Sequence, residues 1–180
     1  MQEKELLTQA LQLNQAALAE IYDQFSPGIY RYAYRILGDA ERAEECVSET
    51  FLRFLNALRS RKGPRDYLKA YLYRIAHNWI IDQFRAKRTE LVELEEEHQD
   101  AMEGDMPDQV MENEEREWVR RAIRLLTPDQ QQVVVLKFLE DWGNDEIART
   151  LNKPVGAVKS LQSRALASLQ KILIREGAEV

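Results

Sequence analysis

The stretch NDEIARTLNKPVGAVKSLQSRAL, residues 144–166, decides the fold of the C-terminal part of the chain. Its apolar spacing predicts a short helix over 145–151 and a second helix from about Val155, with a tight turn between them. Ala148 is small enough for the second helix to cross close above it, and Asn152 lies where the turn needs a residue that tolerates left-handed backbone angles. This pattern indicates a helix-turn-helix.

The predicted helix pair has an apolar inner face and a polar outer face. The inner positions are Ile147, Ala148, Leu151, Val158 and Leu161. The outward positions at the start of the second helix are small, polar or basic: Gly156, Ala157, Lys159, Ser160, Gln162, Ser163 and Arg164. Lys159 and Arg164 can neutralise phosphates, while Gln162 and Ser163 can reach base edges in a major groove. The alternative is two packed helices with a solvated basic face.

Helical periodicity also covers the rest of the chain. Apolar residues recur at spacings of three and four over 17–25, 40–58 and 68–84, and no stretch alternates with period two for long enough to predict a strand. We therefore expect an all-α fold with two small bundles of about four helices each, the second of which contains the helix-turn-helix.

Several turn and capping residues predict where these helices begin and end. Ser26 followed by Pro27 predicts a helix start, and Gly38 followed by Asp39 predicts the end of one helix and the cap of the next. Residues 127–130 have the spacing of a capping box.

The charge is distributed unevenly along the 180 residues, whose net charge is −6. Residues 1–88 carry 14 Lys/Arg against 11 Asp/Glu, residues 89–117 carry 1 against 13, and residues 118–180 carry 10 against 7. These three segments are the predicted domains: a mildly basic bundle, an acidic flexible linker and a second mildly basic bundle. The acidity of the whole chain therefore does not argue against a nucleic-acid partner.

Composition excludes several classes of protein. An apolar fraction of 44% with 31% charged residues is typical of a soluble globular protein. The longest aliphatic run is Val133–Leu136 and the N-terminus lacks a signal pattern, so we expect a cytoplasmic protein without membrane insertion. The single Cys46 occupies an apolar helical position and is expected to be a buried thiol. No metal or cofactor is expected.

Basic and aromatic residues are interleaved between Arg53 and Arg88. This segment contains ten basic residues and two acidic ones, Asp66 and Asp82. This combination suits single-stranded nucleic acid, because Lys and Arg follow the phosphates and an aromatic ring can stack on an unpaired base. The alternative is that the aromatic residues belong to the core, which we expect for Trp79 and Phe84. Tyr67, beside the RKGPRDY loop, is the better stacking candidate.

The preceding helix carries an acidic stripe instead. The stripe consists of Glu41, Glu44, Glu45, Ser48 and Glu49. Such a stripe is most often a solvated face, but it also suits docking to a basic protein partner.

Three segments together resemble the extracytoplasmic-function (ECF) group of bacterial sigma factors. DAERAEECVSETFLRF (39–54) resembles their polymerase-docking helix, LYRIAHNWIIDQFRAKR (72–88) their promoter-melting helix, and residues 126–166 their C-terminal helix-turn-helix domain. The resemblance implies that the first domain binds the β′ clamp of core RNA polymerase and opens the minus-ten element. It implies that the second domain reads the minus-thirty-five element of duplex promoter DNA and sits on the β flap. The resemblance is also consistent with an anti-sigma factor as a further partner.

Site residues follow from the motifs by position. The acidic stripe matches the docking motif, with Phe51 expected in the core. The minus-ten residues, in the base-capturing loop and on the melting helix, are Arg61, Lys62, Arg65, Tyr67, Arg74, His77, Asn78, Asp82, Arg85 and Arg88. The chain departs from the family where Leu161 and Gln162 replace a usual Arg and Leu. Since Leu161 continues the apolar stripe, we interpret this as a repacked helix with an altered outer face.

Two questions stay open at this point. The acidic linker could thread the nucleic-acid channels of polymerase as an RNA mimic, or be a solvated tether. An enzyme is not expected, because the chain lacks a glycine-rich phosphate loop and its one ExxH, Glu95–His98, lies in the linker. The rival function is a stand-alone transcription regulator whose N-terminal bundle binds an effector or dimerises.

Overall fold

A computed structural model describes residues 2–94 and 110–177, with side chains for 2–87 and 114–177. Within these ranges the chain forms helices and connecting turns and no strand. The helices are α1 (Glu3–Leu11), α2 (Gln15–Leu37), α3 (Ala40–Arg59), α4 (Leu68–Leu94), α5 (Val110–Arg124), α6 (Pro128–Val134), α7 (Asn144–Leu151) and α8 (Val155–Arg175), with a π-helical segment η1 (Val135–Leu139) after α6. The prediction of an all-α fold is confirmed.

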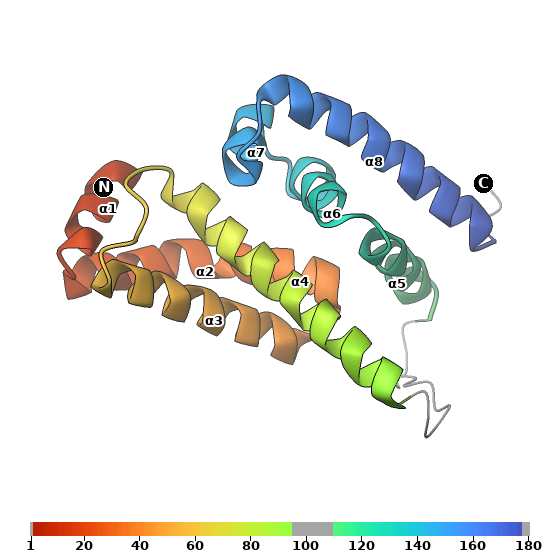
Figure 1. Cartoon of the computed structure of the whole chain (residues 1–180), viewed down its shortest axis with the longest axis horizontal. Helices are drawn as coiled ribbons and strands as arrows, with labels where there is room; N and C mark the ends of the chain where they lie inside the picture. The colour runs from red at the N-terminus through yellow and green to blue at the C-terminus, as the bar shows by residue number, and fades with distance from the viewer. Residues whose placement is uncertain (1, 95–109, 178–180) are drawn as a thin grey trace.

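The N-terminal unit is a bundle of α2, α3 and α4 with the short α1 at one end (Figure 1). Its helices bury one face each, and the fully buried large side chains include Ile21, Tyr32, Phe54, Leu72 and Ile80. Burying such a side chain contributes about 1.5–3 kcal/mol, so the common core holds helices that would be marginal alone.

The helix start predicted at Ser26-Pro27 is wrong. Helix α2 continues through Pro27 and begins instead at Gln15, after the Asn14 cap, whose side chain accepts a hydrogen bond from the Ala17 amide at 3.0 Å. The apolar face continues on both sides of the proline, with Phe25 and Ile29 both buried. Packing of this continuous face outweighs the local preference of proline for a helix start.

The other predicted boundaries are confirmed. Gly38 ends α2 in the left-handed conformation, and Asp39 caps α3 by accepting hydrogen bonds from two backbone amides of its first turn. At α6 the Thr127 hydroxyl accepts from the Gln130 amide, while the Gln130 side chain accepts from the Thr127 amide, both at 3.3 Å. These local bonds depend on neighbouring residues only, which is why the sequence predicts them well.

The C-terminal unit contains the predicted helix-turn-helix as α7 and α8. Asn152 between them has φ 55° and ψ 48°, the left-handed conformation that the turn requires. Ile147, Val158 and Leu161 are buried where the two helices meet. The assignment of Leu161 to the inner face is therefore confirmed.

The predicted linker, 89–117, is partly helical. Helix α4 continues to Leu94 and α5 begins at Val110, so both flanks of the acidic stretch extend the neighbouring helices. The remainder, 95–109, including the ExxH at Glu95–His98, lies outside the described residues. No helix in the described ranges is long and apolar enough to cross a membrane.

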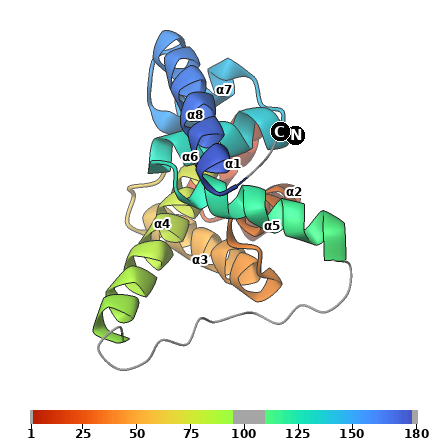
Figure 2. The same ribbon diagram turned by 90° about the vertical axis from the view of Figure 1, so that its right-hand side faces the viewer.

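The two units pack against each other and share one continuous cluster of buried apolar residues. Helix α5 contacts α2, η1 contacts α2, and α7 contacts α4. In Figure 2 the C-terminal unit lies over one side of the N-terminal bundle, and in Figure 1 α5 and α6 lie between α8 and the bundle. Sequence analysis did not predict this arrangement.

Candidate nucleic-acid and polymerase interface

The acidic stripe occupies the solvent face of α3. Glu41, Glu44, Glu45 and Ser48 are exposed, and Glu49 is half-buried with a carboxylate oxygen 3.6 Å from Arg53 Nε. The helix begins at the Asp39 cap, and its opposite face buries residues such as Val47 and Phe54 in the bundle. Thus the packing of one face determines the outward direction of the stripe, which forms a continuous anionic surface.

Phe51 and Cys46 lie on the inner side of the same helix. The Phe51 ring packs against the core and has its centroid 4.8 Å from that of Tyr22. Cys46 is fully buried with its Sγ 3.7 Å from the Ala76 carbonyl oxygen, and burial raises the pKa of the thiol to about 12. Both residues belong to the core, as predicted, and the thiol is unreactive at neutral pH.

The loop before α4 presents cations to solvent. Arg61, Lys62 and Arg65 are exposed, as is Tyr67, with 51% of its surface accessible. The Tyr67 backbone has φ 50°, and the guanidinium carbon of Arg149, from α7, lies 4.5 Å from the centroid of its ring. One face of the proposed stacking ring is therefore covered by the other unit.

Arg74 reaches from α4 to the C-terminal end of α7. Its Nε donates to the Thr150 carbonyl at 3.0 Å, and its Nη2 donates to the Arg149 carbonyl at 2.8 Å. These carbonyls belong to the last turn of α7, where a helix leaves acceptors without partners and where a cation is favourable. Arg74 therefore caps α7 across the boundary between the units.

His77 is buried, with 4% of its surface exposed. Its Nε2 donates to the Pro128 carbonyl at 2.9 Å, and its Nδ1 accepts from the Tyr32 hydroxyl at 2.6 Å. Burial lowers the pKa of His77 to about 4, so the ring is neutral at neutral pH. The structure places this proposed minus-ten residue between the two units and not on an open surface.

The remaining minus-ten residues lie further along α4. Asn78, Asp82 and Arg85 are exposed, and an Asp82 carboxylate oxygen lies 4.0 Å from Arg53 Nη1. The Arg88 side chain lies outside those that the structure describes. Trp79 is buried and Phe84 packs against the core, so their interpretation as core residues is confirmed.

The outward face of α8 is accessible near its N-terminus. Gly156, Lys159, Ser160, Ser163 and Arg164 are exposed, while Ala157 and Gln162 are half-buried. Gln162 Nε2 donates to Asn144 Oδ1 at 2.7 Å, which leaves its carbonyl oxygen and second N–H for other partners. The side chains that could read base edges thus come from a single helix, oriented by its partner α7.

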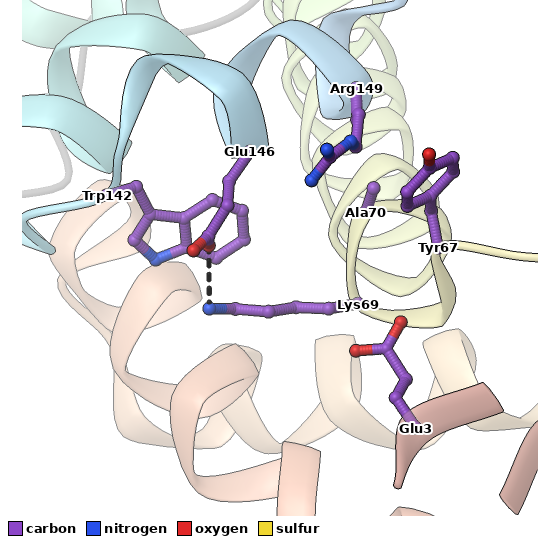
Figure 3. Close-up of a pocket in the computed structure, with 7 residues that line it drawn as sticks. All are labelled: Glu3, Tyr67, Lys69, Ala70, Trp142, Glu146 and Arg149. Atoms are coloured by element: carbon purple, nitrogen blue, oxygen red, sulfur yellow. Dashed lines mark hydrogen bonds and ion pairs between the residues drawn. The ribbon is translucent and has the colours of Figure 1, made fainter. Parts of the chain in front are cut away.

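A cavity of about 250 Å³ lies where the units meet (Figure 3). It is lined by residues of α1, α4 and α7, by Tyr67 in the loop before α4 and by Trp142 in the loop before α7. Lys69 Nζ lies 3.1 Å from Glu146 Oε2 and 4.1 Å from the centroid of the Trp142 ring. Sequence analysis missed the role of Trp142, whose ring packs on Tyr73 at 4.6 Å. Among the described residues, His, Cys, Asp and Glu form no cluster that could hold a metal ion.

Comparison with known proteins identifies the family. Residues 21–90 match the family model Sigma-70 region 2, and residues 116–169 match Sigma-70, region 4. The ECF RNA polymerase sigma factor SigW of Bacillus subtilis is 32% identical over 181 residues, covering 94% of this chain and 96% of SigW. The chain belongs to the ECF sigma factor family. Sigma factors are transcription initiation factors and not enzymes, and the resemblance of the three motifs is confirmed.

A second relative of this sigma factor is longer. The ECF RNA polymerase sigma factor BldN of Streptomyces coelicolor is 36% identical over 159 residues, which are 87% of this chain and 60% of BldN. Among solved structures, the sigma factor RpoE in complex with the anti-sigma factor NepR from Bartonella quintana matches with a TM-score of 0.60 and 21% identity. That match covers 86% of this chain and 95% of RpoE and supports the fold.

Proposed function

We propose that this ECF sigma factor binds core RNA polymerase and directs it to specific promoters. The observation that carries the proposal is the order of three surfaces in one chain: an anionic docking helix, a cationic aromatic segment and a helix-turn-helix, within matches to regions 2 and 4. A stand-alone regulator needs only the last of these, and nothing in the comparisons supports that alternative.

The acidic stripe on α3 is the proposed docking surface for the β′ clamp. Its support is geometric, because four of its five members are exposed and together they form a uniformly anionic or polar face. A basic partner would be attracted by this face. The β flap is the proposed partner of the C-terminal unit, by the family resemblance alone.

The two DNA contacts are proposed on different elements. The loop 61–67 and the exposed side of α4 are proposed to hold the melted minus-ten strand, with cations on phosphates and Tyr67 on a base. The N-terminal half of α8 is proposed to enter the major groove of the minus-thirty-five element. Its exposed Lys159 and Arg164 suit phosphate contacts and Gln162 suits a base contact.

An anti-sigma factor and a cytoplasmic location complete the proposal. The RpoE structure described above contains such a factor, and this supports a partner of the same kind here. Transcription takes place in the bacterial cytoplasm, and the absence of a membrane-spanning helix among the described residues is consistent with that location.

The direct test is transcription in vitro. Core polymerase mixed with the purified chain should start transcripts at defined genomic promoters at low salt, and core polymerase alone should not. If no defined start sites emerge, or if the chain alone protects both the upstream element and the minus-ten element as fully as the mixture does, the stand-alone regulator is the better description.

Docking is tested by charge reversal. Glu45→Lys with Glu49→Lys should weaken binding to core polymerase, because the α3 surface would then repel a basic partner while its buried face stays intact. The matched control is Glu3→Lys with Glu5→Lys on α1, outside the stripe. If both double variants pull down core polymerase equally well, the stripe is a solvated face and not a docking surface.

A further inference from the structure

The amide of Gln162 is held at the rim of the contact between α7 and α8. Val158 and Leu161 of the same helix are buried, and Gln162 follows them as a half-buried side chain. Its Nε2 donates to Oδ1 of Asn144, the first residue of α7, at 2.7 Å. The last torsion of a free glutamine side chain is broadly distributed, so this hydrogen bond selects one orientation of the amide plane.

Asn144 is held in place by the loop before α7 and by the first turn of the helix. The backbone amide of Trp142, a buried residue, donates to the Leu136 carbonyl at 2.9 Å. The carbonyl of Gly143, the N-cap, accepts from the amide of the buried Ile147 at 3.1 Å. Buried neighbours on both sides therefore define where the Asn144 side chain can lie.

The hydrogen bond to Asn144 leaves a specific pair of groups on the Gln162 amide. A primary amide has two N–H donors and a carbonyl oxygen, so one N–H remains beside the oxygen. The major-groove edge of adenine presents the complementary pair, because N7 accepts and the N6 amino group donates. Guanine presents two acceptors there, cytosine a donor, and thymine an acceptor beside a methyl group. Adenine is therefore the base that satisfies both remaining groups.

We propose that Gln162 reads an adenine of the upstream promoter element through this bidentate contact, and that Asn144 is the positioning residue for it. The inference rests on the proposed function, which places the N-terminal half of α8 in the major groove. It concerns this chain in particular, because the Leu that is usual in the family at position 162 has no hydrogen-bonding group. Lys159 and Arg164 suit phosphates and add affinity without a base preference.

The first measurement changes the DNA and leaves the protein intact. The full chain bound to core polymerase selects duplexes from a random library, and each adenine of the selected upstream element is then replaced by 7-deazaadenine or N6-methyladenine. The first analogue lacks the N7 acceptor and the second blocks the amino group in the major groove, while both keep the Watson–Crick pair. At one adenine, each analogue should weaken binding by about fivefold. The same analogues should have no effect at that position on binding by Gln162→Ala.

The second measurement asks whether Asn144 acts through Gln162. Asn144→Ala should lower the discrimination at the same base pair by about threefold when Gln162 is present, and should change nothing further in Gln162→Ala. Asn144→Asp keeps an oxygen that accepts from Gln162, so it should preserve the discrimination, although its charge should weaken binding to all sequences. Asp145→Ala, at an exposed neighbour, is the matched control and should change affinity uniformly.

Each result either supports the contact or contradicts it. The proposal is overturned if no adenine analogue has an effect that depends on Gln162, or if the base pair at which Gln162→Ala relaxes preference is not read as adenine. Equal effects of Asn144→Ala with and without Gln162 would overturn its positioning role. Transcription from the same templates is measured in parallel. Loss of defined starts with the wild-type chain would contradict the proposed function, whereas defined starts without any analogue effect would contradict this inference alone.

Discussion

The surface of α8 and the surface of α4 that we propose to contact DNA are built in different ways. The α8 surface is local: one helix, its partner α7 and the Asn152 turn determine which side chains point outward. The α4 surface is shared with residues that are 50 or more positions away, because His77 contacts Pro128 and Arg74 contacts Thr150. A local surface is complete as soon as its helices form, whereas a shared surface also depends on the relative position of the two units.

The largest expected effect concerns the inner face of α8. Leu161 is 7% exposed and packs in the core, so Leu161→Arg should lower the free energy of unfolding by about 3–5 kcal/mol, as a buried unpaired charge does. Leu166→Arg is the matched control, because Leu166 is 45% exposed. It should change the free energy of unfolding by no more than about 0.5 kcal/mol. Chemical denaturation of both full-length variants measures the difference. A stable Leu161→Arg variant with stronger DNA binding would show that the two faces are assigned the wrong way round.

The shared surface should be weakened by acid. The pKa of His77 is about 4 in the folded chain and about 6.5 when unfolded, so protons bind preferentially to the unfolded state as the pH falls. The contribution of His77 is therefore fully present above pH 6.5, decreases from there toward pH 4, and amounts to roughly 3 kcal/mol at most. His77→Gln should show a flatter stability profile between pH 6.5 and 4 in denaturation experiments. Parallel profiles for both proteins would mean that His77 is not buried as a neutral ring.

A smaller effect is expected at Gly38, where α2 meets α5. Gly38 has φ 70°, and a Cβ there would lie 2.8 Å from Arg120 Nη1. Gly38→Ala should therefore lower the free energy of unfolding by about 1–2 kcal/mol. Gly156→Ala is the control on the local surface, because no atom lies within 4 Å of its Cβ position and helical alanine is favourable by up to about 1 kcal/mol. The melting temperature should fall for Gly38→Ala and rise for Gly156→Ala. Similar shifts would contradict the close approach of Arg120 to the end of α2.

The smallest expected effect tests the outward face of α8. Gln162→Ala should relax discrimination at one base pair of the upstream element by about 1 kcal/mol, at the low end for such contacts because Asn144 already uses one donor of the amide. Asn144→Ala should alter preference at the same base pair, since it orients Gln162. Gln170→Ala, exposed further along α8, is the control. The measurement is the binding affinity for each single-base variant of the upstream element. If Gln162→Ala leaves the order of these affinities unchanged, Gln162 does not read a base.

Local chemistry explains what could be predicted from the sequence. The Thr127 capping box, the Asp39 cap, the Asn152 turn and the inner position of Leu161 all depend on residues a few positions apart. Pro27 was misjudged because the packing of α2 along its whole length outweighs a local signal. The motif residues were found by resemblance, and their exposure on α3 and α8 agrees with helical periodicity.

The shared surface could not be predicted because its determinants lie in another part of the chain. Nothing near Arg74 in the sequence indicates that it caps α7, and nothing near Glu140 indicates that its partners are on α2. Trp142 resembles an ordinary core residue in the sequence, although it packs between the units against Tyr73 and Lys69. Such contacts follow from the relative position of the two units, which local periodicity does not encode.

Photocrosslinking from two positions tests the central proposal most directly, namely that α4 contacts the melted minus-ten strand and α8 contacts the upstream duplex. A photoreactive residue would replace Asn78 on α4 in one sample and Ser160 on α8 in another, both exposed positions. On promoter DNA, position 160 should crosslink to the upstream duplex with or without core polymerase. Position 78 should crosslink to the minus-ten strand only when core polymerase is present. Equal crosslinking from position 78 without polymerase, or none with it, would contradict the account.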